Sequence, residues 1–334
     1  MSWSGSGSRF VVAPSAPFAR FLLRRIGIGA GQLLILLVLV FVLSLLLPGD
    51  AADVQNNDIL GADQRAAARR LLGLDVAPAQ RFLEWLGRAV TGDFGVSYAS
   101  GESVGGLIVQ PFLVTGLMAV LVLVVLLPTA TAAGFAAGLR PGSVRDRVIT
   151  SASIGFDSVP DFVLAVLLVT YVAIELDLVP ATFLGTDPDT ILARPEYLIL
   201  PLIVMVARVV APLVRLVRAG VVDVMAQPYI AQAQRLGVGR RSLLLRHVAP
   251  NALGPALQEL GRTGDGLLSG VLIVEAVFVM PGIASELIGA IGNRDDPVIL
   301  AIVSITGVLA IVINLVIDVV GQRLVPRSAE GARG

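Results

Sequence analysis

The stretch IGIGAGQLLILLVLVFVLSLLL, residues 26–47, decides the fold class of this chain. A bilayer core of roughly 30 Å is crossed by about 20 apolar residues when a helix rises ~1.5 Å per residue. Residues 26–47 have that length and contain no charged side chain. They are too long for the apolar part of a cleavable signal, and no small-residue cleavage pattern follows them. We therefore predict a membrane-spanning helix that stays in the bilayer.

Five further stretches are long and apolar enough to cross a membrane. They are residues 110–139, 156–178, 197–217, 253–280 and 298–320. The composition agrees, because 55% of the 334 residues are hydrophobic and the mean hydropathy is +0.84, which is too apolar for the surface of a soluble domain. The predicted fold class is an all-α polytopic membrane protein with six transmembrane helices.

Composition also excludes several kinds of chemistry. The net charge is zero, so the chain lacks the basic balance of a nucleic-acid-binding protein. It has no Cys and one His, which excludes thiol catalysis and a multi-His zinc site. Every basic residue is Arg, and a phosphate-binding Walker loop needs Lys. We therefore expect no catalytic residue, metal or cofactor in this chain, and any ATP hydrolysis belongs to another subunit.

The distribution of arginine predicts the orientation, because basic loops are retained on the cytoplasmic side. Arginines gather before the first predicted span, between the second and third, after the fourth and after the sixth. The opposite loops also carry arginine, but Asp and Glu outnumber it there. Both termini are therefore predicted to be cytoplasmic.

The predicted spans divide the chain into five parts. These are a Ser- and Gly-rich disordered tail at 1–17, the first transmembrane helix at 18–47, an extracytoplasmic helical subdomain at 48–109, the transmembrane core at 110–321 and a cytoplasmic tail at 322–334. In the subdomain, Phe82, Leu86, Ala89 and Val90 follow helical spacing, with Trp85 close by. We expect this face to pack on the outer ends of the spans; a docking surface for an extracellular partner is the alternative.

The cytoplasmic loop at 225–250 is the most informative segment of the core. Small and apolar residues follow helical spacing there and form one smooth face: Ala226, Ile230, Ala233 and Gly237. Gly237 and Gly239 can end that helix, and Pro250 can start the next span. The loop is therefore predicted to be a helix–turn–helix bracket. Considered alone, such a basic amphipathic loop is typical of an anchor to lipid headgroups.

Charged residues interrupt the fifth predicted span. Glu259, Arg262 and Asp265 recur at every third position, so they share one helix face with opposite signs adjacent. Because charges in hydrocarbon are costly, this face should meet protein or water. Two hypotheses follow: the face lines a translocation path, or it is a structural ion-pair ladder. Glu275 raises the same question as a gate residue.

The bracket resembles the Glu-Ala-Ala loop of ABC importer permeases. Ala231, Gln232 and Ala233 fall at the three signature positions, Gly237 falls at the pattern's Gly, and Pro250 falls at its later Pro. Ala231 replaces the Glu, and Gln232 replaces the first Ala. The spacing from Tyr229 and Ile230 to Gly237 is similar to that of the peptide branch of the family.

Further blocks extend this resemblance over nearly the whole chain, from about residue 18 to 327. They are LPGD at 47–50, GDFGVS at 92–97, EAVFVMPGI at 275–283 and NRDDP at 293–297. The last two contain the extracytoplasmic signature residues Pro281, Gly282, Asn293, Arg294 and Asp295. Together the blocks resemble the first membrane subunit of the dipeptide, oligopeptide and nickel permeases.

That resemblance implies a transport subunit of the bacterial inner membrane. It implies a second homologous permease subunit, two cytoplasmic ATPase subunits or one fused ATPase that bind ATP and Mg, and an extracytoplasmic substrate-binding protein. The implied ATPase-coupling residues are Tyr229, Ile230, Ala231, Ala233, Gly237 and Pro250. The implied solute is a dipeptide or oligopeptide; a nickel chelate, haem or glutathione is the alternative.

Two other classes of protein share some of these features. An ion-driven secondary transporter would also have six helices and charges in the membrane, but it has no reason to carry the bracket. An intramembrane enzyme could use Asp157 and Asp161 as an aspartyl pair, but no partnered Asp motif follows elsewhere in the chain.

Overall fold

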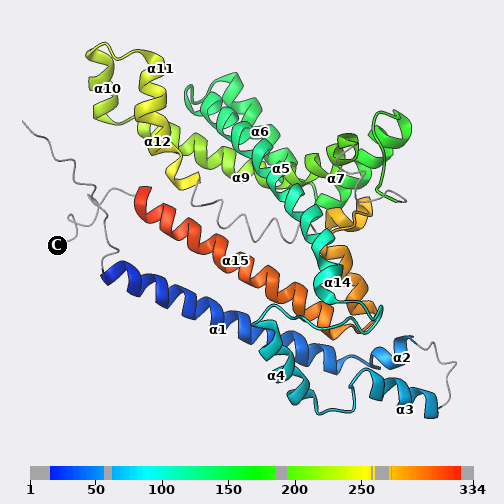
Figure 1. Ribbon diagram of the computed structural model, residues 1–334. Coiled ribbons are helices and arrows are strands. Elements are labelled where there is room, and N and C mark those ends of the chain that lie inside the picture. The colour runs from blue at the N-terminus through cyan, green and yellow to red at the C-terminus, as the bar shows by residue number, and fades with distance from the viewer. Residues whose placement is uncertain are drawn as a thin grey trace, which may run out of the picture.

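The computed structural model describes residues 16–55, 62–184, 194–256, 259, 271 and 273–324 (Figure 1). The elements before the cytoplasmic loop are α1 (Ala16–Leu46), α2 (Ala51–Gln55), α3 (Ala62–Leu71), α4 (Pro78–Ala89), α5 (Val104–Gly138), α6 (Val144–Ser158), α7 (Asp161–Leu168), the π-helix η1 (Val169–Glu175), the 3-10 helix η2 (Pro195–Leu198) and α9 (Ile199–Met225). After it come α10 (Pro228–Arg235), α11 (Arg240–Leu243), the π-helix η3 (Leu244–Val248), α12 (Ala249–Ala252), α14 (Ile283–Gly292) and α15 (Asp296–Leu324).

The predicted all-α class is confirmed. Four helical stretches are long and apolar enough to cross a membrane: Arg20–Leu46, Val104–Gly138, Pro195–Met225 and Asp296–Val316. Helices α6 and α7 with η1 make a fifth candidate if the bent pair is one span. Half of the predicted span at 253–280 lies outside the described residues, as do residues 1–15 and 325–334 of the predicted tails. The count of six spans therefore stays a prediction.

The third predicted span differs from its expected form. Helix α6 begins at Val144, twelve residues before the expected start at residue 156, and the chain then bends by 98° before α7. Val159, at the bend, has extended backbone angles. The cause is Pro160, because a proline disfavours helical geometry in the residue that precedes it.

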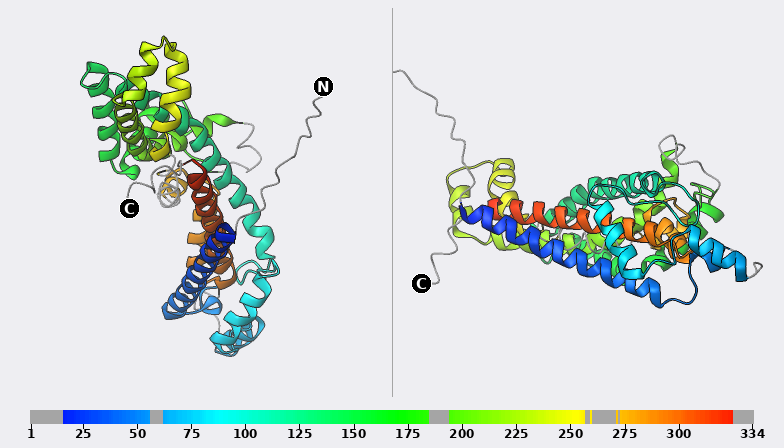
Figure 2. Two further views of the ribbon diagram at one scale, coloured as in Figure 1. Left: turned by 90° about the vertical axis from the view of Figure 1, so that its left-hand side faces the viewer. Right: turned by 60° about the horizontal axis from the view of Figure 1, so that its bottom comes forward.

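The chain's first and last described helices lie side by side (Figures 1 and 2). Helix α15 carries Gly307 where a Cβ would approach Leu33 of α1 to 2.5 Å, so the small residue permits close contact. The Arg25 Nε donates to Asp318 Oδ2 at 2.6 Å. This ion pair joins the first part of α1 to the last part of α15.

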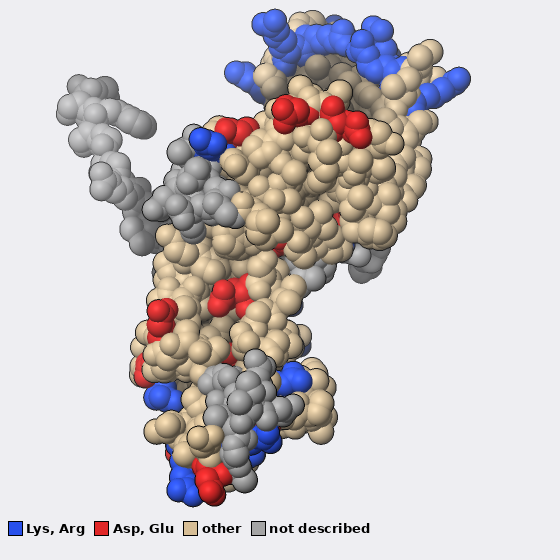
Figure 3. Space-filling view, turned by 90° about the vertical axis from the view of Figure 1, so that its right-hand side faces the viewer, with Lys and Arg blue, Asp and Glu red and all other residues tan. Residues whose placement is uncertain are grey.

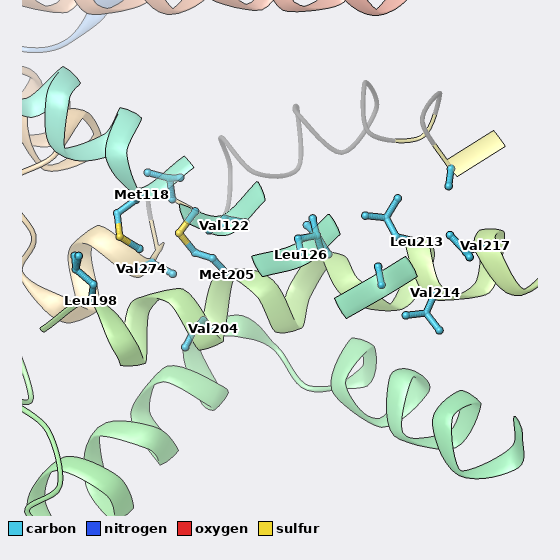
Figure 4. Packing of buried hydrophobic residues seen from close by; sticks show 14 of the residues in the cluster. Met118, Val122, Leu126, Leu198, Val204, Met205, Leu213, Val214, Val217 and Val274 are labelled. Atoms are coloured by element: carbon cyan, nitrogen blue, oxygen red, sulfur yellow. The ribbon is translucent and has the colours of Figure 1, made fainter. Parts of the chain in front are cut away.

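A second packed group is built around α5 and α9 (Figure 4). Apolar side chains from both helices form its core, including Met118, Val122, Leu126, Leu213, Val214 and Val217. The helices approach closely because α5 has Gly134 and Gly138 at the contact. A Cβ at Gly134 would lie 2.5 Å from the Val217 Cβ, so a side chain would push α9 away.

The small helices α2, α3 and α4 lie at one end of α1 (Figure 1). Phe82 and Trp85 of α4 are buried against α1 and α15, in a cluster with Leu37, Phe41 and Leu300. The apolar face of α4 therefore packs on the long helices as predicted, except at Val90, which follows the end of α4 and is 82% exposed. The Trp85 Nε1 donates to the carbonyl oxygen of Phe94 at 3.2 Å, so the polar end of this buried ring has its partner.

Candidate functional site

The predicted bracket is present in the structure (Figure 1). Helix α10 ends in a Schellman turn: the Gly237 N–H donates to the Gln234 carbonyl at 3.0 Å, and the Val238 N–H donates to the Ala233 carbonyl at 3.1 Å. Gly237 has φ +78°, a left-handed conformation that favours glycine. Helices α11, η3 and α12 then return the chain, with Pro250 in the first turn of α12.

The smooth face predicted at 226–237 is divided: Ile230 and Ala233 are turned inward, whereas Ala226 and Gly237 are exposed. Ile230 is 1% exposed and belongs to the core that contains α9, and Ala233 packs against that core. Neither side chain forms an open docking face. The exposed surface of the bracket instead includes Tyr229, Ala231 and Leu236, and Leu236 is 75% exposed.

Arginines surround this exposed surface. Arg235, Arg240, Arg241 and Arg246 are all exposed on the bracket, and Arg145 and Arg147 are exposed on α6. Figure 3 shows Arg at both ends of the molecule, in a dense group at the top and mixed with Asp and Glu at the bottom. The tip of the bracket therefore combines a small apolar surface with positive charge.

Of the three charged residues in the fifth predicted span, the structure describes Glu259. Glu259 is half-buried. Arg262 and Asp265 lie outside the described residues, so both hypotheses for this face stay open.

Glu275 is the centre of a buried hydrogen-bond cluster. Its side chain is 2% exposed. One carboxylate oxygen accepts from Thr115 Oγ1 of α5 at 2.6 Å, and the other accepts from the Ala284 N–H at 2.7 Å and the Ser285 N–H at 3.2 Å. The carboxylate therefore caps the N-terminus of α14 and joins it to α5. In this conformation Glu275 holds helices together; its predicted role as a gate is untested.

The residues of the PGI turn fit around this carboxylate. A Cβ at Gly282 would lie 2.1 to 2.5 Å from the carboxylate atoms of Glu275, so only glycine leaves the space. The Ile283 N–H donates to Thr115 Oγ1 at 3.0 Å. Pro281 is half-buried next to these residues. The predicted signature residues Pro281 and Gly282 thus have a packing reason.

The second signature block joins α15 to the small helices and to α1. Asp295 is buried and accepts from Ser97 Oγ at 2.5 Å, the Tyr98 N–H at 3.1 Å and the Ala99 N–H at 3.2 Å. Burial raises the pKa of the Tyr98 phenol, which therefore stays neutral.

Its neighbours complete the junction. Asp296 accepts from Ser44 Oγ and from Arg81 Nη2. Asn293 is the exposed residue that ends α14, and Arg294 follows it.

Three arginines of α9 form ion pairs that the sequence did not reveal as a set. Arg208 pairs with Asp161, Arg215 with Asp157 at 3.1 Å, and Arg218 with Asp146 at 2.5 Å. These arginines are spaced by seven and three residues, which places them on one face of α9. The pairs attach α6 and α7 to α9, and they engage both Asp157 and Asp161. The helical spacing of the arginines was the available signal.

Comparisons with known proteins agree with the bracket and the signature blocks. Residues 130–330 match the family model described as binding-protein-dependent transport system inner membrane component, and residues 18–119 match the model of its N-terminal region. The glutathione transport system permease protein GsiC of Escherichia coli K12 is 32% identical over 294 residues, 88% of this chain and 94% of the relative. BOV_A0351 of Brucella ovis, which carries a provisional peptide-permease name, is 31% identical over 92% of this chain and 98% of its own length.

The chain therefore belongs to the family of binding-protein-dependent transport system inner membrane components. Within that family it is a permease of the dipeptide and oligopeptide group of ABC importers, as the sequence resemblance predicted. It is a membrane transport subunit of the peptide and glutathione type.

Proposed function

We propose that this chain forms half of the path along which a peptide-like solute is imported, and that a second, related permease subunit forms the other half. The observation that carries the proposal is the bracket, because its tip is exposed while its base at Ile230 is buried with α9. A displacement of α10 is therefore passed to a helix long enough to cross the membrane.

The exposed tip of the bracket is the contact for the ATPase. Tyr229, Ala231, Leu236 and Gly237 are exposed and form its surface. Ile230 and Ala233 contribute indirectly, because they pack α10 against the chain's own hydrophobic core. Pro250 starts the short helix that leads away from the bracket.

Separate subunits supply the energy and deliver the solute. The chain has no lysine for a phosphate-binding loop, which supports placing ATP and Mg on the ATPase partners. The description of the matching family supports an extracytoplasmic binding protein. The names of the relatives support a peptide-like solute, since glutathione is itself a tripeptide.

Co-purification followed by reconstitution tests this proposal. The chain, isolated from its native membrane, should bring with it a second permease and ATPase subunits. In vesicles, the complex should accumulate peptide only when ATP and the binding protein are both present. A panel of dipeptides, oligopeptides, glutathione, haem and a nickel chelate, titrated onto the binding protein, identifies the solute. Uptake by this chain alone, driven by an ion gradient, would contradict the proposal.

A further inference from the structure

A polar cavity of about 380 Å³ lies where α1 ends. Its walls come from the end of α1, from α2 and α3, from the start of α4 and from the loop after α14. The polar residues that line it are Ser44, three aspartates and three arginines: Asp50, Asp53, Asp296, Arg69, Arg81 and Arg294. Cavities of roughly 300–1,000 Å³ are typical of small-molecule sites. It lies at the opposite end of α14 from Glu275, and no residue of the bracket lines it.

One of the cavity's arginines, Arg294, makes no close ion pair among the described residues, although its charge acts on the neighbouring Asp296. Arg69 pairs with Asp50 at 3.0 Å, and Arg81 pairs with Asp296 at 3.2 Å. Arg294 makes no ion pair within the described ranges. Its Nη1 donates to the Ile291 carbonyl at 3.4 Å, and its Nη2 donates to the Pro48 carbonyl at 3.4 Å.

The buried guanidinium nitrogens of the cavity are also incompletely bonded. The Nε of Arg294 is buried and has no acceptor among the residues that the structure describes, and the same holds for the Nε of Arg81. A buried donor without an acceptor is costly. The three arginines of the cavity are matched in number by its three aspartates, but Arg294 still offers a positive charge and an unused donor to an anionic group.

The backbone of Arg294 is a second, independent observation. Arg294 has φ +56°. Its N–H donates to the Ile291 carbonyl at 3.2 Å, and the Asp295 N–H donates to the Ala290 carbonyl at 2.9 Å, so Arg294 occupies the left-handed position of a Schellman turn. Glycine is the residue favoured there, and a side chain is strained. Strain of this kind at a non-glycine residue is a reason to ask whether the side chain has a function.

The position of the cavity identifies the anion. Leu45, Leu46 and Leu47 are exposed beside it, and Leu46 is 74% exposed. They form the end of an apolar span, which is the level at which lipid headgroups lie. A guanidinium is suited to binding phosphate through two parallel hydrogen bonds.

We propose that Arg294 binds the phosphate of a phospholipid headgroup in this cavity, with the acyl chains lying along the exposed side of α1. Asp53 also faces the cavity, and its carboxylate accepts only the Asp50 N–H within the described part of the chain. It therefore offers an acceptor to the ammonium group of an ethanolamine headgroup.

Arg294→Gly separates this role from a structural one, because glycine relieves the backbone strain and removes the side chain. The full chain, purified with its accompanying subunits and stripped of lipid, is titrated with dihexanoyl phosphatidylethanolamine. Inorganic phosphate and dihexanoylglycerol are titrated in parallel. The readouts are phospholipids bound per complex, by native mass spectrometry, and the midpoint of thermal unfolding, which a bound ligand raises.

We expect phosphatidylethanolamine alone to raise the midpoint of the wild-type protein. Arg294→Gly should unfold at the same or a higher midpoint without lipid and lose the lipid-dependent shift. Asp177→Gly is the matched control, because Asp177 is exposed, has φ +48° and does not line the cavity; it should keep the shift. The proposal is overturned by a lipid shift that survives in Arg294→Gly, by an equal shift with inorganic phosphate, or by a lower midpoint of Arg294→Gly before lipid is added.

Discussion

A single carboxylate, that of Glu275, connects segments that are far apart in the sequence. It reaches Thr115 on α5 and two backbone N–H groups at the start of α14. Gly282 leaves the space that the carboxylate fills. At this scale, the family signature is explained by one buried acceptor and the glycine that admits it.

Gly282→Ala should therefore destabilise the protein. The added Cβ would overlap the Glu275 carboxylate and displace it from three donors, and each buried donor left unpaired costs about 1–3 kcal/mol. The thermal midpoint of the purified chain measures the effect. Gly289→Ala on the same segment is the control: nothing lies within 4 Å of its Cβ, so the helix should gain roughly 0.5–1 kcal/mol. Equal midpoints for the two variants would show that the carboxylate is not held as described.

At the scale of elements, α9 is the helix on which the others are assembled. It packs on α5 through apolar side chains, and three ion pairs attach α6 and α7 to it. The bracket follows directly from its last turn. Any motion of the bracket is thus imposed on the helices that α9 holds.

The ion pairs should differ in importance according to their exposure. Asp146 is buried and receives two donors from Arg218, at 2.5 and 2.8 Å. Arg215 and Asp157 are 44% and 37% exposed, and such surface pairs are worth about 0–1 kcal/mol. Asp146→Asn should therefore lower the unfolding midpoint more than Asp157→Asn does.

A charge reversal provides the check on that comparison. The double variant Asp146→Arg with Arg218→Asp should recover stability relative to either single reversal, measured as a double-mutant cycle. Purely additive effects in this cycle would rule out the pair as the cause.

The bracket's buried and exposed residues should give different phenotypes. Ile230→Ala removes a buried side chain and should cost about 2–5 kcal/mol of unfolding free energy. Leu236→Glu changes an exposed side chain, so it should leave the midpoint unchanged but weaken co-purification of the ATPase subunits. Leu245→Glu, also exposed but on η3, is the control for surface charge. If Leu236→Glu retains the ATPase subunits fully, the proposed contact lies elsewhere.

At the scale of the whole molecule, the described helices form two packed groups. One contains α1, α15 and the small helices α2 to α4, and the other contains α5, α6, α7, α9 and the bracket (Figures 1 and 2). Helix α5 also contacts α14 and α15, and Glu275 reinforces that junction. The bracket and the small helices therefore belong to different groups.

The predicted orientation can be tested directly because the chain has no cysteine. Single cysteines at Glu102, beside the small helices, and at Gln234, on α10, are both exposed. With cytoplasmic termini, a membrane-impermeant maleimide added to intact cells should label Glu102→Cys alone. Permeabilised cells provide the control, since both variants should then react. Labelling of Gln234→Cys in intact cells would reverse the orientation and remove the basis for an ATPase contact.

The long apolar helices could be predicted from the sequence because each is encoded in a continuous run. Residues 26–47 and 298–320 lie almost entirely within α1 and α15. The bracket could also be predicted, since Gly237 and Pro250 mark its turns locally. The start of helix α6 was harder to predict, because the charged residues there interrupt the apolar pattern: Arg145, Asp146 and Arg147. In the folded chain, Asp146 accepts from Arg218 and from the Gly142 N–H, and Ser143 caps the helix, which together make that charged turn favourable.

The candidate site was predictable in location but not in its contacts. The periodicity of α10 identified an apolar face without indicating that it turns toward α9. Thr115 lies 160 residues from Glu275, and Ser97 lies 198 residues from Asp295. Such pairings arise from tertiary packing, which no local spacing encodes.

The pairing of α1 with α15 has a consequence for biogenesis. Arg25 and Asp318 are separated by 293 positions, so at about 5–20 residues per second a ribosome makes the second roughly 15–60 s after the first. During that interval the first helix is in the bilayer without the helix that later packs against it. Leucine lies on all faces of this first helix, so lipid can surround it during that time. In a polypeptide truncated before the final helix, the first helix would never acquire its partner.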